Sequence, residues 1–273
     1  MSPRDERWQP VVDPSTGQPF GRVALSGPEE ARAAMEAAAD QEETWGRTPG
    51  HERARVLRAI ADGIEAAREV LAQLIAREVG KPIQDARVET GRAVSVYRLA
   101  AEEARQLTGE TFPADAYAYP PGNEKRLLFT VRDPIGVVVA ISPFNFPLNL
   151  LSHKVAPALA AGNPVVVKPA SAAALTALRL ARIAEAAGVP KGVLNVVPGP
   201  GGAVGNLLVE HPATRLVTFT GSTEVGTSIA ERAGRRAKRV ILEMGGMDPV
   251  VVLDDAPLEV AVPAVVRGTF TYS

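Results

Sequence analysis

A repeated alternation of short apolar runs and longer helical patterns, between residues 135 and 253, most constrains the fold of this chain. The runs IGVVVAI, PVVVKPA, VLNVV, RLVTFTG, RVILEM and PVVVL each predict a strand. The segments LNLLSHKVAPALAAG, ALTALRLARIAEAAG, AVGNLLVE and TEVGTSIAERAG between them are typical of helices. Continuous apolar strands that alternate with helices indicate βαβ units. We therefore predict an α/β fold with a parallel sheet flanked by helices.

The rest of the chain carries different patterns. Residues 1–27 read as short extended pieces with turns, and from Pro28 the apolar residues recur at helical spacing. The third long helix is expected to run from about residue 82 to 107 and to end near Gly109. Residues 116–133, with two tyrosines, a PPGNE turn and an LLFTVR run, predict a two-stranded ribbon that projects from the domain.

Composition excludes several classes of function. The net charge is −1, with 30 basic and 31 acidic residues, so no charge excess points to nucleic acid or an anionic membrane. No apolar run reaches the ~20 residues that span a bilayer, and the charged start lacks the apolar core of a signal peptide. We therefore expect a cytoplasmic protein. The sequence has no cysteine and only three histidines, far apart, so no metal site is predicted.

Polar side chains follow two of the predicted strands. Ligands of parallel sheets bind at the carboxyl ends of the strands, so these positions are candidates for a site. Asn145 lies in the stiff turn SPFNFP, where it either caps a helix that begins near Pro147 or donates its amide N–H to a developing oxyanion. Lys168 is either solvated or bonds the hydroxyls or phosphate of a ligand.

Two further strand ends suggest contacts with phosphate. Gly199, Gly201 and Gly205 in PGPGGAVG give a GxGxxxG spacing, one residue longer than the usual dinucleotide fingerprint, and a plain glycine-rich turn fits them equally well. Ser222 is first of all a helix N-cap, with Glu224 in the first turn. A contact between Ser222 and a pyrophosphate would use the same geometry.

Glu243 stands at the end of a buried-looking strand, and Gly245 and Gly246 follow it directly after one methionine. A carboxylate is costly to bury unless it is paired or used. The glycines leave space for a ligand that approaches closely. Glu243 is therefore a candidate general base.

Taken together, the stretches SPFNFPLNLLSHKVAPALAAGNPVVVKPA, PGPGGAVG, VTFTGSTEVG and LEMGG resemble the aldehyde dehydrogenase superfamily in their order and spacing, over essentially the whole chain. The resemblance implies a Rossmann-like fold. Residues 1–115 and 134–243 would form the dinucleotide-binding domain, 116–133 an oligomerisation hairpin, and 244–273 the start of a catalytic domain. It also implies a homodimer or homotetramer for a full-length relative.

The resemblance assigns roles to matching positions. Asn145 would donate to the oxyanion, Glu243 would activate water, and Lys168 would bind the adenosine ribose of NAD or NADP. The residues expected at the cofactor are Ser142, Pro143, Phe144, Lys168, Ala170, Ser171, Gly201, Gly205, Phe219, Gly221, Ser222 and Met244.

The implied reaction oxidises an aldehyde, small and polar, to the carboxylic acid. A Cys thiolate attacks the aldehyde, hydride passes to NAD(P)⁺, and water that the Glu activates hydrolyses the thioester. Glu243 favours hydrolysis over transfer to coenzyme A. This chain has no cysteine, so the nucleophile is expected beyond Ser273 and the chain alone is expected to be inactive. Met247 stands where relatives commonly carry Lys.

The sequence is compatible with more than one cofactor and with more than one function. Relatives selective for NAD often carry an acid three residues after the Lys, where this chain has Ser171, so NADP is expected to be admitted. The alternative to an enzyme is a non-catalytic nucleotide-binding module or an inactive truncated aldehyde dehydrogenase.

Overall fold

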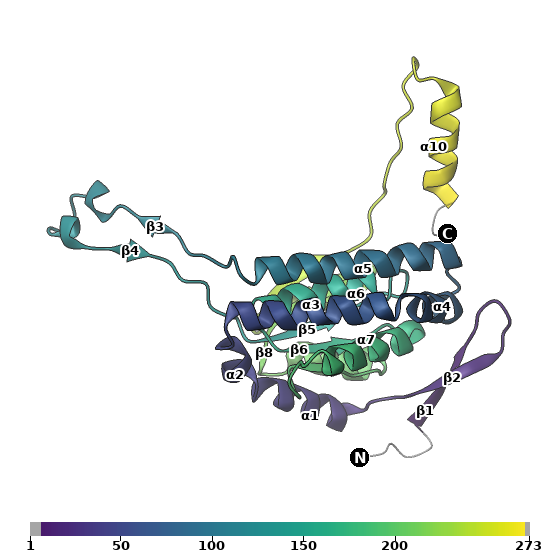
Figure 1. Ribbon diagram of the computed structural model, residues 1–273, viewed down its shortest axis with the longest axis horizontal. Coiled ribbons are helices and arrows are strands. Elements are labelled where there is room, and N and C mark those ends of the chain that lie inside the picture. The colour runs from purple at the N-terminus through teal and green to yellow at the C-terminus, as the bar shows by residue number, and fades with distance from the viewer. Residues whose placement is uncertain (1–6, 271–273) are drawn as a thin grey trace.

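A five-stranded parallel sheet in the order β7-β6-β5-β8-β9 forms the centre of the fold. Its strands β5, β6 and β8 are labelled among the helices in Figure 1. The computed structural model describes residues 7–270. From β5 the chain first builds outward through β6 and β7 and then returns to the other side for β8 and β9, so the strand order reverses between β5 and β8. This confirms the predicted α/β parallel sheet. The strands are β5 (Val137–Ile141), β6 (Val165–Lys168), β7 (Leu194–Val196), β8 (Thr214–Thr220) and β9 (Arg239–Glu243).

Helices cover both faces of the sheet. Side chains alternate across the pleat of β5, so Ala140 packs into one core while Val137, Val139 and Ile141 pack into the other. The first core is closed by α2 (Glu42–Gly46), α3 (Gly50–Ala66), α4 (Arg68–Val79), α5 (Ile83–Glu103), α6 (Asn149–Ala160) and α7 (Ala174–Ala186). The second is closed by α1 (Pro28–Ala39), α8 (Asn206–Glu210) and α9 (Thr223–Gly234).

The N-terminal part follows the sequence prediction with one shift. Strands β1 (Trp8–Val12) and β2 (Pro19–Ala24) pair antiparallel, as the extended pattern predicted. Helix α5 ends at Glu103, four residues earlier than expected. The buried face of the helix stops at Ala104, and Leu107 is exposed. Without a core to pack against, the last residues gain nothing from continuing the helix.

A projecting ribbon leaves the body between α5 and β5 (Figure 1). Its strands β3 (Thr111–Phe112) and β4 (Leu128–Phe129) pair antiparallel, so a ribbon is confirmed but its first strand lies before residue 116. The tip holds the 3₁₀ turns η2 (Ala114–Ala116) and η3 (Asn123–Lys125). The carbonyls of Tyr117 and Tyr119 accept from Nδ2 of Asn123, so the tyrosines belong to the tip loop and not to a strand.

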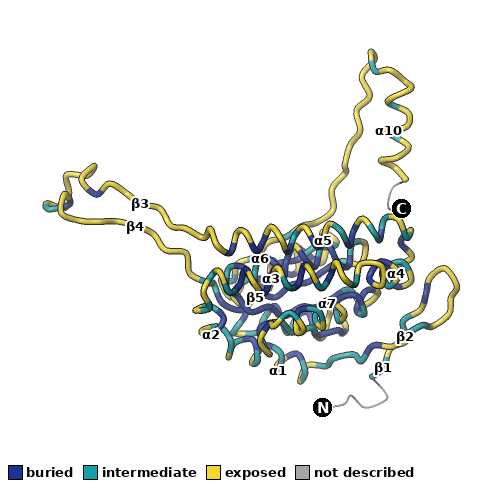
Figure 2. Tube along the Cα trace, viewed as in Figure 1, coloured by how far each residue is buried: buried dark blue, intermediate teal, exposed yellow. Residues whose placement is uncertain are grey.

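A second arm begins after β9 and runs as extended chain to α10 (Leu258–Phe270) (Figure 1). The prediction of a strand in PVVVL is wrong, because residues 249–253 pair with no described strand and are exposed (Figure 2). An apolar run shows only that a segment is suited to burial, and not that a partner strand lies beside it. That residues 244–273 begin a catalytic domain stays a prediction, and 271–273 lie outside the described residues. Within residues 7–270, no helix has the length and apolar character needed to cross a membrane.

Candidate functional site

A cavity of about 530 Å³ lies at the carboxyl ends of β5, β6 and β8, beside the point where the strand order reverses. This is where ligands bind in open parallel sheets. The predicted cofactor residues that line it are Ser142, Pro143, Phe144, Lys168, Gly201, Gly205, Phe219, Gly221 and Ser222. The lining does not include Ala170, Ser171 or Met244.

Lys168 places a cation inside this cavity. The residue is 7% exposed, and burial lowers the pKa of its ammonium group. Nζ donates to the carbonyl oxygen of Pro169 at 2.8 Å and to no other atom of residues 7–270. An ammonium group has three donors. Lys168 is therefore a buried cation with donors left for the hydroxyl or phosphate oxygens of a ligand.

The glycine turn has one packed glycine and two open ones. Residues Gly201–Gly205 form a single π-helical turn that leads into α8. A Cβ atom on Gly199 would lie 2.7 Å from Cγ2 of Val204 and 2.8 Å from the carbonyl oxygen of Ser26. A Cβ atom on Gly201 or Gly202 would meet nothing within 4 Å. Gly199 is therefore required for packing, whereas Gly201 and Gly202 expose backbone to the cavity.

Helix α9 points its N-terminus at the same cavity. Oγ of Ser222 accepts from the backbone N–H of Val225 at 3.4 Å, which confirms the predicted N-cap. Ser222, Glu224 and Val225 all line the cavity. The free N–H groups and the positive end of the helix dipole favour an anion here. A Cβ atom on Gly221 would lie 2.5 Å from the ring of buried Phe219, so only glycine fits at that position.

A second cavity, of about 650 Å³, lies beside β8 and β9, and Thr220 lines both cavities. Lys154 of α6 donates from Nζ to Oγ1 of Thr220 at 2.6 Å. Burial lowers the pKa of Lys154 to about 8, and the nearby carboxylate of Glu243 partly opposes this shift. Glu243 and Met244 line this second cavity.

The prediction that Glu243 ends a buried strand is wrong. Strand β9 is an edge strand whose residues alternate between exposed and half-buried, and Glu243 is exposed. The apolar run RVILEM predicts a buried strand, because periodicity does not separate an edge strand from a central one. Glu243 therefore lies at the surface of the described chain, and it lines the same cavity as Lys154.

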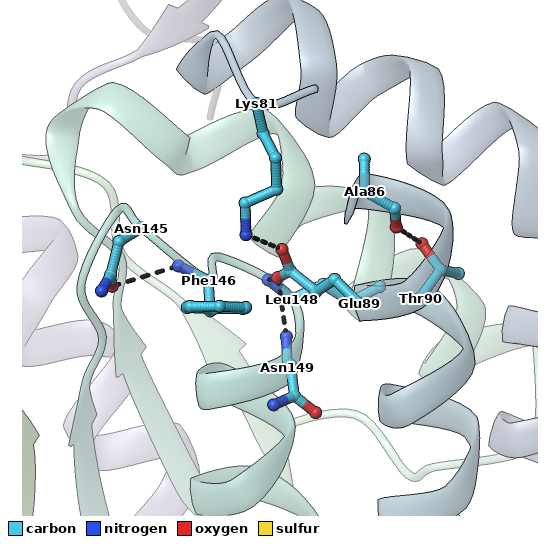
Figure 3. A network of polar contacts seen from close by, with 8 residues as sticks. All are labelled: Lys81, Ala86, Glu89, Thr90, Asn145, Phe146, Leu148 and Asn149. Atoms are coloured by element: carbon cyan, nitrogen blue, oxygen red, sulfur yellow. Dashed lines mark hydrogen bonds and ion pairs between the residues drawn. The ribbon is translucent and has the colours of Figure 1, made fainter. Parts of the chain in front are cut away.

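Asn145 lies in the loop between β5 and α6 and is exposed. The alternative that it caps the helix is wrong, because α6 begins at Asn149 and the N–H groups of Leu148 and Asn149 donate to Glu89 (Figure 3). Oδ1 of Asn145 accepts from the N–H of Phe146 at 3.1 Å, and Nδ2 donates to no atom of residues 7–270. Its side-chain N–H groups are thus available to a ligand.

Sequence reasoning missed two charged residues beside the site, Lys154 and Glu89. The signals were present in the sequence. Lys154 is the single Lys, Arg, Asp or Glu of α6, and it is buried. Glu89 falls on the same helical face as Ala86, Ala93 and Tyr97, which are all buried, so its position predicts a buried carboxylate.

The first cavity thus combines a buried lysine, an open glycine turn and a helix N-terminus at the ends of parallel strands. These features define the class of α/β domains that bind dinucleotides. Within the described part of the chain, no group of three or more His, Cys, Asp or Glu could hold a metal ion.

The aldehyde dehydrogenase family model matches residues 1–273, so the chain belongs to the aldehyde dehydrogenase family. It is 39% identical to a lactaldehyde dehydrogenase of Methanocaldococcus jannaschii, over 96% of the chain and 55% of that relative. It is 41% identical to an NADP⁺ succinate-semialdehyde dehydrogenase of Escherichia coli, over 95% of the chain and 52% of that relative. The chain spans about half the length of the curated relatives it matches.

A solved structure shows the same similarity. The NADP-dependent glyceraldehyde-3-phosphate dehydrogenase from Bacillus halodurans, in complex with NADP, is 40% identical and superimposes with a TM-score of 0.93. The match covers 98% of this chain and 55% of that one. The Rossmann-like fold predicted from the sequence is therefore confirmed.

Proposed function

We propose that this chain is the cofactor-binding portion of an NAD(P)-dependent enzyme that oxidises a small, polar aldehyde to the carboxylic acid. The observation that carries the proposal is the cavity at the ends of β5, β6 and β8. It brings together Lys168, the open backbone of Gly201 and Gly202, and the N-terminus of α9.

These residues fit a dinucleotide. The unused donors of buried Lys168 suit the ribose hydroxyls or a phosphate. The α9 N-terminus capped by Ser222 suits the pyrophosphate, and a side chain at Gly201 would fill space that the cofactor needs. When bound, NAD(P)⁺ supplies the acceptor for a hydride. Ala170 and Ser171 lie just beyond Lys168, where the resemblance places the ribose.

Three residues of this chain have roles in the proposed reaction besides cofactor binding. Asn145 offers an unpaired Nδ2 group to the oxyanion that forms when a carbonyl is attacked. The carboxylate of Glu243 accepts a proton from the water that hydrolyses the acyl intermediate. Lys154 lines the same cavity as Glu243, and burial lowers its pKa to about 8, so its ammonium group can release or take up a proton within this cavity near neutral pH.

The proposed substrate class rests on the names of relatives. Lactaldehyde, succinate semialdehyde and 3-sulfolactaldehyde are named as substrates of proteins 39% to 41% identical to this chain. Each of these aldehydes is small and carries a polar group. The proposed cofactor is NADP, with NAD admitted, because uncharged Ser171 would not repel a 2′-phosphate.

A second candidate function is nucleotide binding without chemistry. The observation that favours it is that the chain has no cysteine, so its own residues cannot form a thioester with an aldehyde. Both functions require the same cofactor cavity, but only the enzyme requires Asn145 and Glu243.

We also propose that the ribbon of β3 and β4 joins subunits of the whole protein. It projects from the body, and most of its trace is coloured as exposed (Figure 2). Large apolar residues on both strands and at the tip are among these exposed residues. Unpaired strand edges with such side chains favour association. The exposed large apolar residues are Phe112, Tyr117, Tyr119, Leu127, Leu128, Phe129 and Val131.

The test of the proposed reaction uses a protein that joins this sequence to a nucleophile-bearing segment of a relative. We expect it to reduce NADP⁺ in the presence of lactaldehyde or succinate semialdehyde. Glu243→Gln should slow turnover by about 10²- to 10⁴-fold, the usual contribution of a general base, while it leaves cofactor affinity unchanged. Turnover that is insensitive to Glu243→Gln would contradict the role of Glu243. Cofactor binding without any turnover would favour the second candidate function.

A further inference from the structure

A buried ion pair lies beneath the loop that carries Asn145 (Figure 3). Nζ of Lys81 is 2.6 Å from Oε2 of Glu89, and their side chains are 6% and 0% exposed. A buried pair of charges is seldom worth more to stability than two well-packed apolar residues. The pair therefore calls for an explanation other than stability alone.

Glu89 connects α5 to the start of α6. Its Oε1 atom accepts from the N–H of Leu148 at 2.9 Å and from the N–H of Asn149 at 3.1 Å. One carboxylate thus satisfies two of the free amides of the first turn and favours the positive end of the helix. The end of the 142–148 loop is fixed to α5 by these bonds.

Lys81 extends this connection toward Asn145. Its Nζ lies 3.5 Å from the ring centroid of Phe146, within the range of a cation–π contact. Phe146 in turn donates its N–H to Oδ1 of Asn145 at 3.1 Å. Figure 3 shows Phe146 between Asn145 and the ion pair. The contacts run without interruption from Glu89 through Lys81 and Phe146 to the Asn145 amide.

A comparison within the chain separates this role from capping. Glu78 of α4 caps α7 in the same way, with 2.6 and 2.9 Å bonds from the N–H groups of Leu175 and Thr176. Glu78 also accepts from the hydroxyl of Thr176. Unlike Glu89, which pairs with Lys81, Glu78 forms no ion pair with any residue that the structure describes. A buried glutamate can therefore cap a helix N-terminus in this chain without a lysine as its partner. The lysine is present at the one cap whose loop carries Asn145.

We propose that Glu89 and Lys81 are positioning residues that hold the side-chain amide of Asn145 in the direction required for the oxyanion. The proposal rests on the proposed function of Asn145. The ion pair fixes where the ammonium group lies, the ammonium fixes the ring of Phe146, and the N–H of Phe146 fixes Oδ1. With Oδ1 held, Nδ2 has a defined direction.

The test is an NMR spectrum of the 273-residue chain with ¹⁵N-labelled asparagine. It compares Lys81→Met, Lys81→Arg and Glu78→Gln. We expect Lys81→Met to shift and broaden the side-chain NH₂ signal of Asn145, and Lys81→Arg to restore it because arginine keeps both charge and ring contact. The control Glu78→Gln disturbs a buried cap of the same kind and should leave that signal in place.

A second variant distinguishes a change at Asn145 from a loss of folding. The double variant Lys81→Met/Glu89→Gln removes both charges and leaves an amide oxygen to accept from Leu148 and Asn149. It should retain protection of those two amides against hydrogen exchange and still disturb the Asn145 signal. An Asn145 signal unchanged in both Lys81 variants and in the double variant would overturn the proposal. An equal disturbance of the Asn145 signal by Glu78→Gln would also overturn the proposal.

The catalytic consequence is measured in the joined protein described above. We expect Lys81→Met to lower kcat about tenfold with little change in KM, because a misaimed donor weakens only the interaction made in the transition state. An unchanged kcat would overturn the positioning role. The NMR signature does not require any aldehyde oxidation, so it fails or succeeds independently of the proposed function.

Discussion

At the scale of single residues, Gly201 and Gly221 differ in the space around their Cα atoms. Gly221 is packed against the Phe219 ring, whereas Gly201 borders open cavity. We expect Gly221→Ala to lower the free energy of unfolding by about 1–3 kcal/mol through overpacking. Gly201→Ala should leave stability within about 0.5 kcal/mol and weaken NADP⁺ binding about tenfold. Urea unfolding and calorimetric titration check both effects. Full affinity in Gly201→Ala would show that the cofactor does not reach this turn.

Ser171 is the residue at which cofactor preference should be adjustable. It is exposed and lies three residues after Lys168. Ser171→Glu places a negative charge where a 2′-phosphate is expected, and repulsion at a solvated site is worth about 1 kcal/mol or more. NADP⁺ affinity should fall about five- to tenfold while NAD⁺ affinity is unchanged. Ser171→Gln is the uncharged control. Equal losses in the two variants would assign the effect to size and not to charge.

Lys154 should make stability depend on pH. Its pKa is lowered by burial from 10.5 to about 8, so above pH 8 the unfolded chain binds more protons than the folded one. Stability therefore rises with pH between about 8 and 10.5. Each unit corresponds to about 1.4 kcal/mol, which gives a rise of about 1–3 kcal/mol for this group.

The pH experiment needs a control because the pKa values of Lys168 and Lys238 are lowered in the same direction. The difference between the wild type and Lys154→Met isolates the contribution of Lys154. The measurement is the free energy of unfolding in urea at pH 7.5 and 9.5. An identical rise in the two proteins would refute the buried cation at this position.

The site residues that follow strands were within reach of sequence reasoning because a parallel sheet puts all its carboxyl ends at one edge. Lys168 and Ser222 could be placed in this way. Glu89 and Lys81 could not be joined to the site by the same rule, because they lie on a helical layer whose contact with the 142–148 loop is a tertiary contact. The exposure of Glu243 could not be predicted from its position at a strand end either.

At the scale of elements, apolar runs identified the strands of the sheet but not their surroundings. The runs at β5 and β6 are buried at every position, as a central strand should be. The runs at β9 and at residues 249–253 look alike in the sequence, yet one is an edge strand and the other has no strand partner among the described residues. What distinguishes them is the presence of a neighbour, which local sequence does not encode.

The ribbon of β3 and β4 gives an element-scale prediction. Leu127 is exposed on the ribbon and Leu99 is exposed on α5 of the body. If the ribbon joins subunits, Leu127→Asp should reduce the sedimentation coefficient of the joined protein toward that of a monomer. Leu99→Asp should not. Both substitutions lie at exposed positions and should leave the melting temperature nearly unchanged. Equal effects of the two would remove the ribbon from the interface.

At the scale of the whole molecule, the arm from residue 244 onward carries apolar side chains that nothing in the described chain covers. Exposed residues include Val250, Val251, Leu253, Leu258 and Val260. Such a patch favours association. We expect the 273-residue chain to self-associate, and a version that ends at Met247 to do so less while it binds NADP⁺ equally well. Analytical sedimentation and titration check this. If the shorter chain associates as strongly as the 273-residue chain, the arm after Met247 is not the surface that drives association.

The intact mass of the protein from its native cell bears on the same arm. A mass near 28.7 kDa, the value for this sequence, would leave cofactor binding or a partner chain as the source of function. A mass of about 50 kDa would correspond to a second domain of ordinary size that covers the arm.

Cofactor binding beside Lys168 is tested by a calorimetric titration of NADP⁺ into the 273-residue chain and into its Lys168→Met variant. Lys168 is buried in the cavity, and methionine keeps the length of its apolar stem. We expect saturable binding of one NADP⁺ per chain, at least tenfold weaker in Lys168→Met, with both proteins folded to the same extent. A folded chain that binds no NADP⁺, or binds it equally well without the ammonium group, would show that this cavity is not the cofactor site.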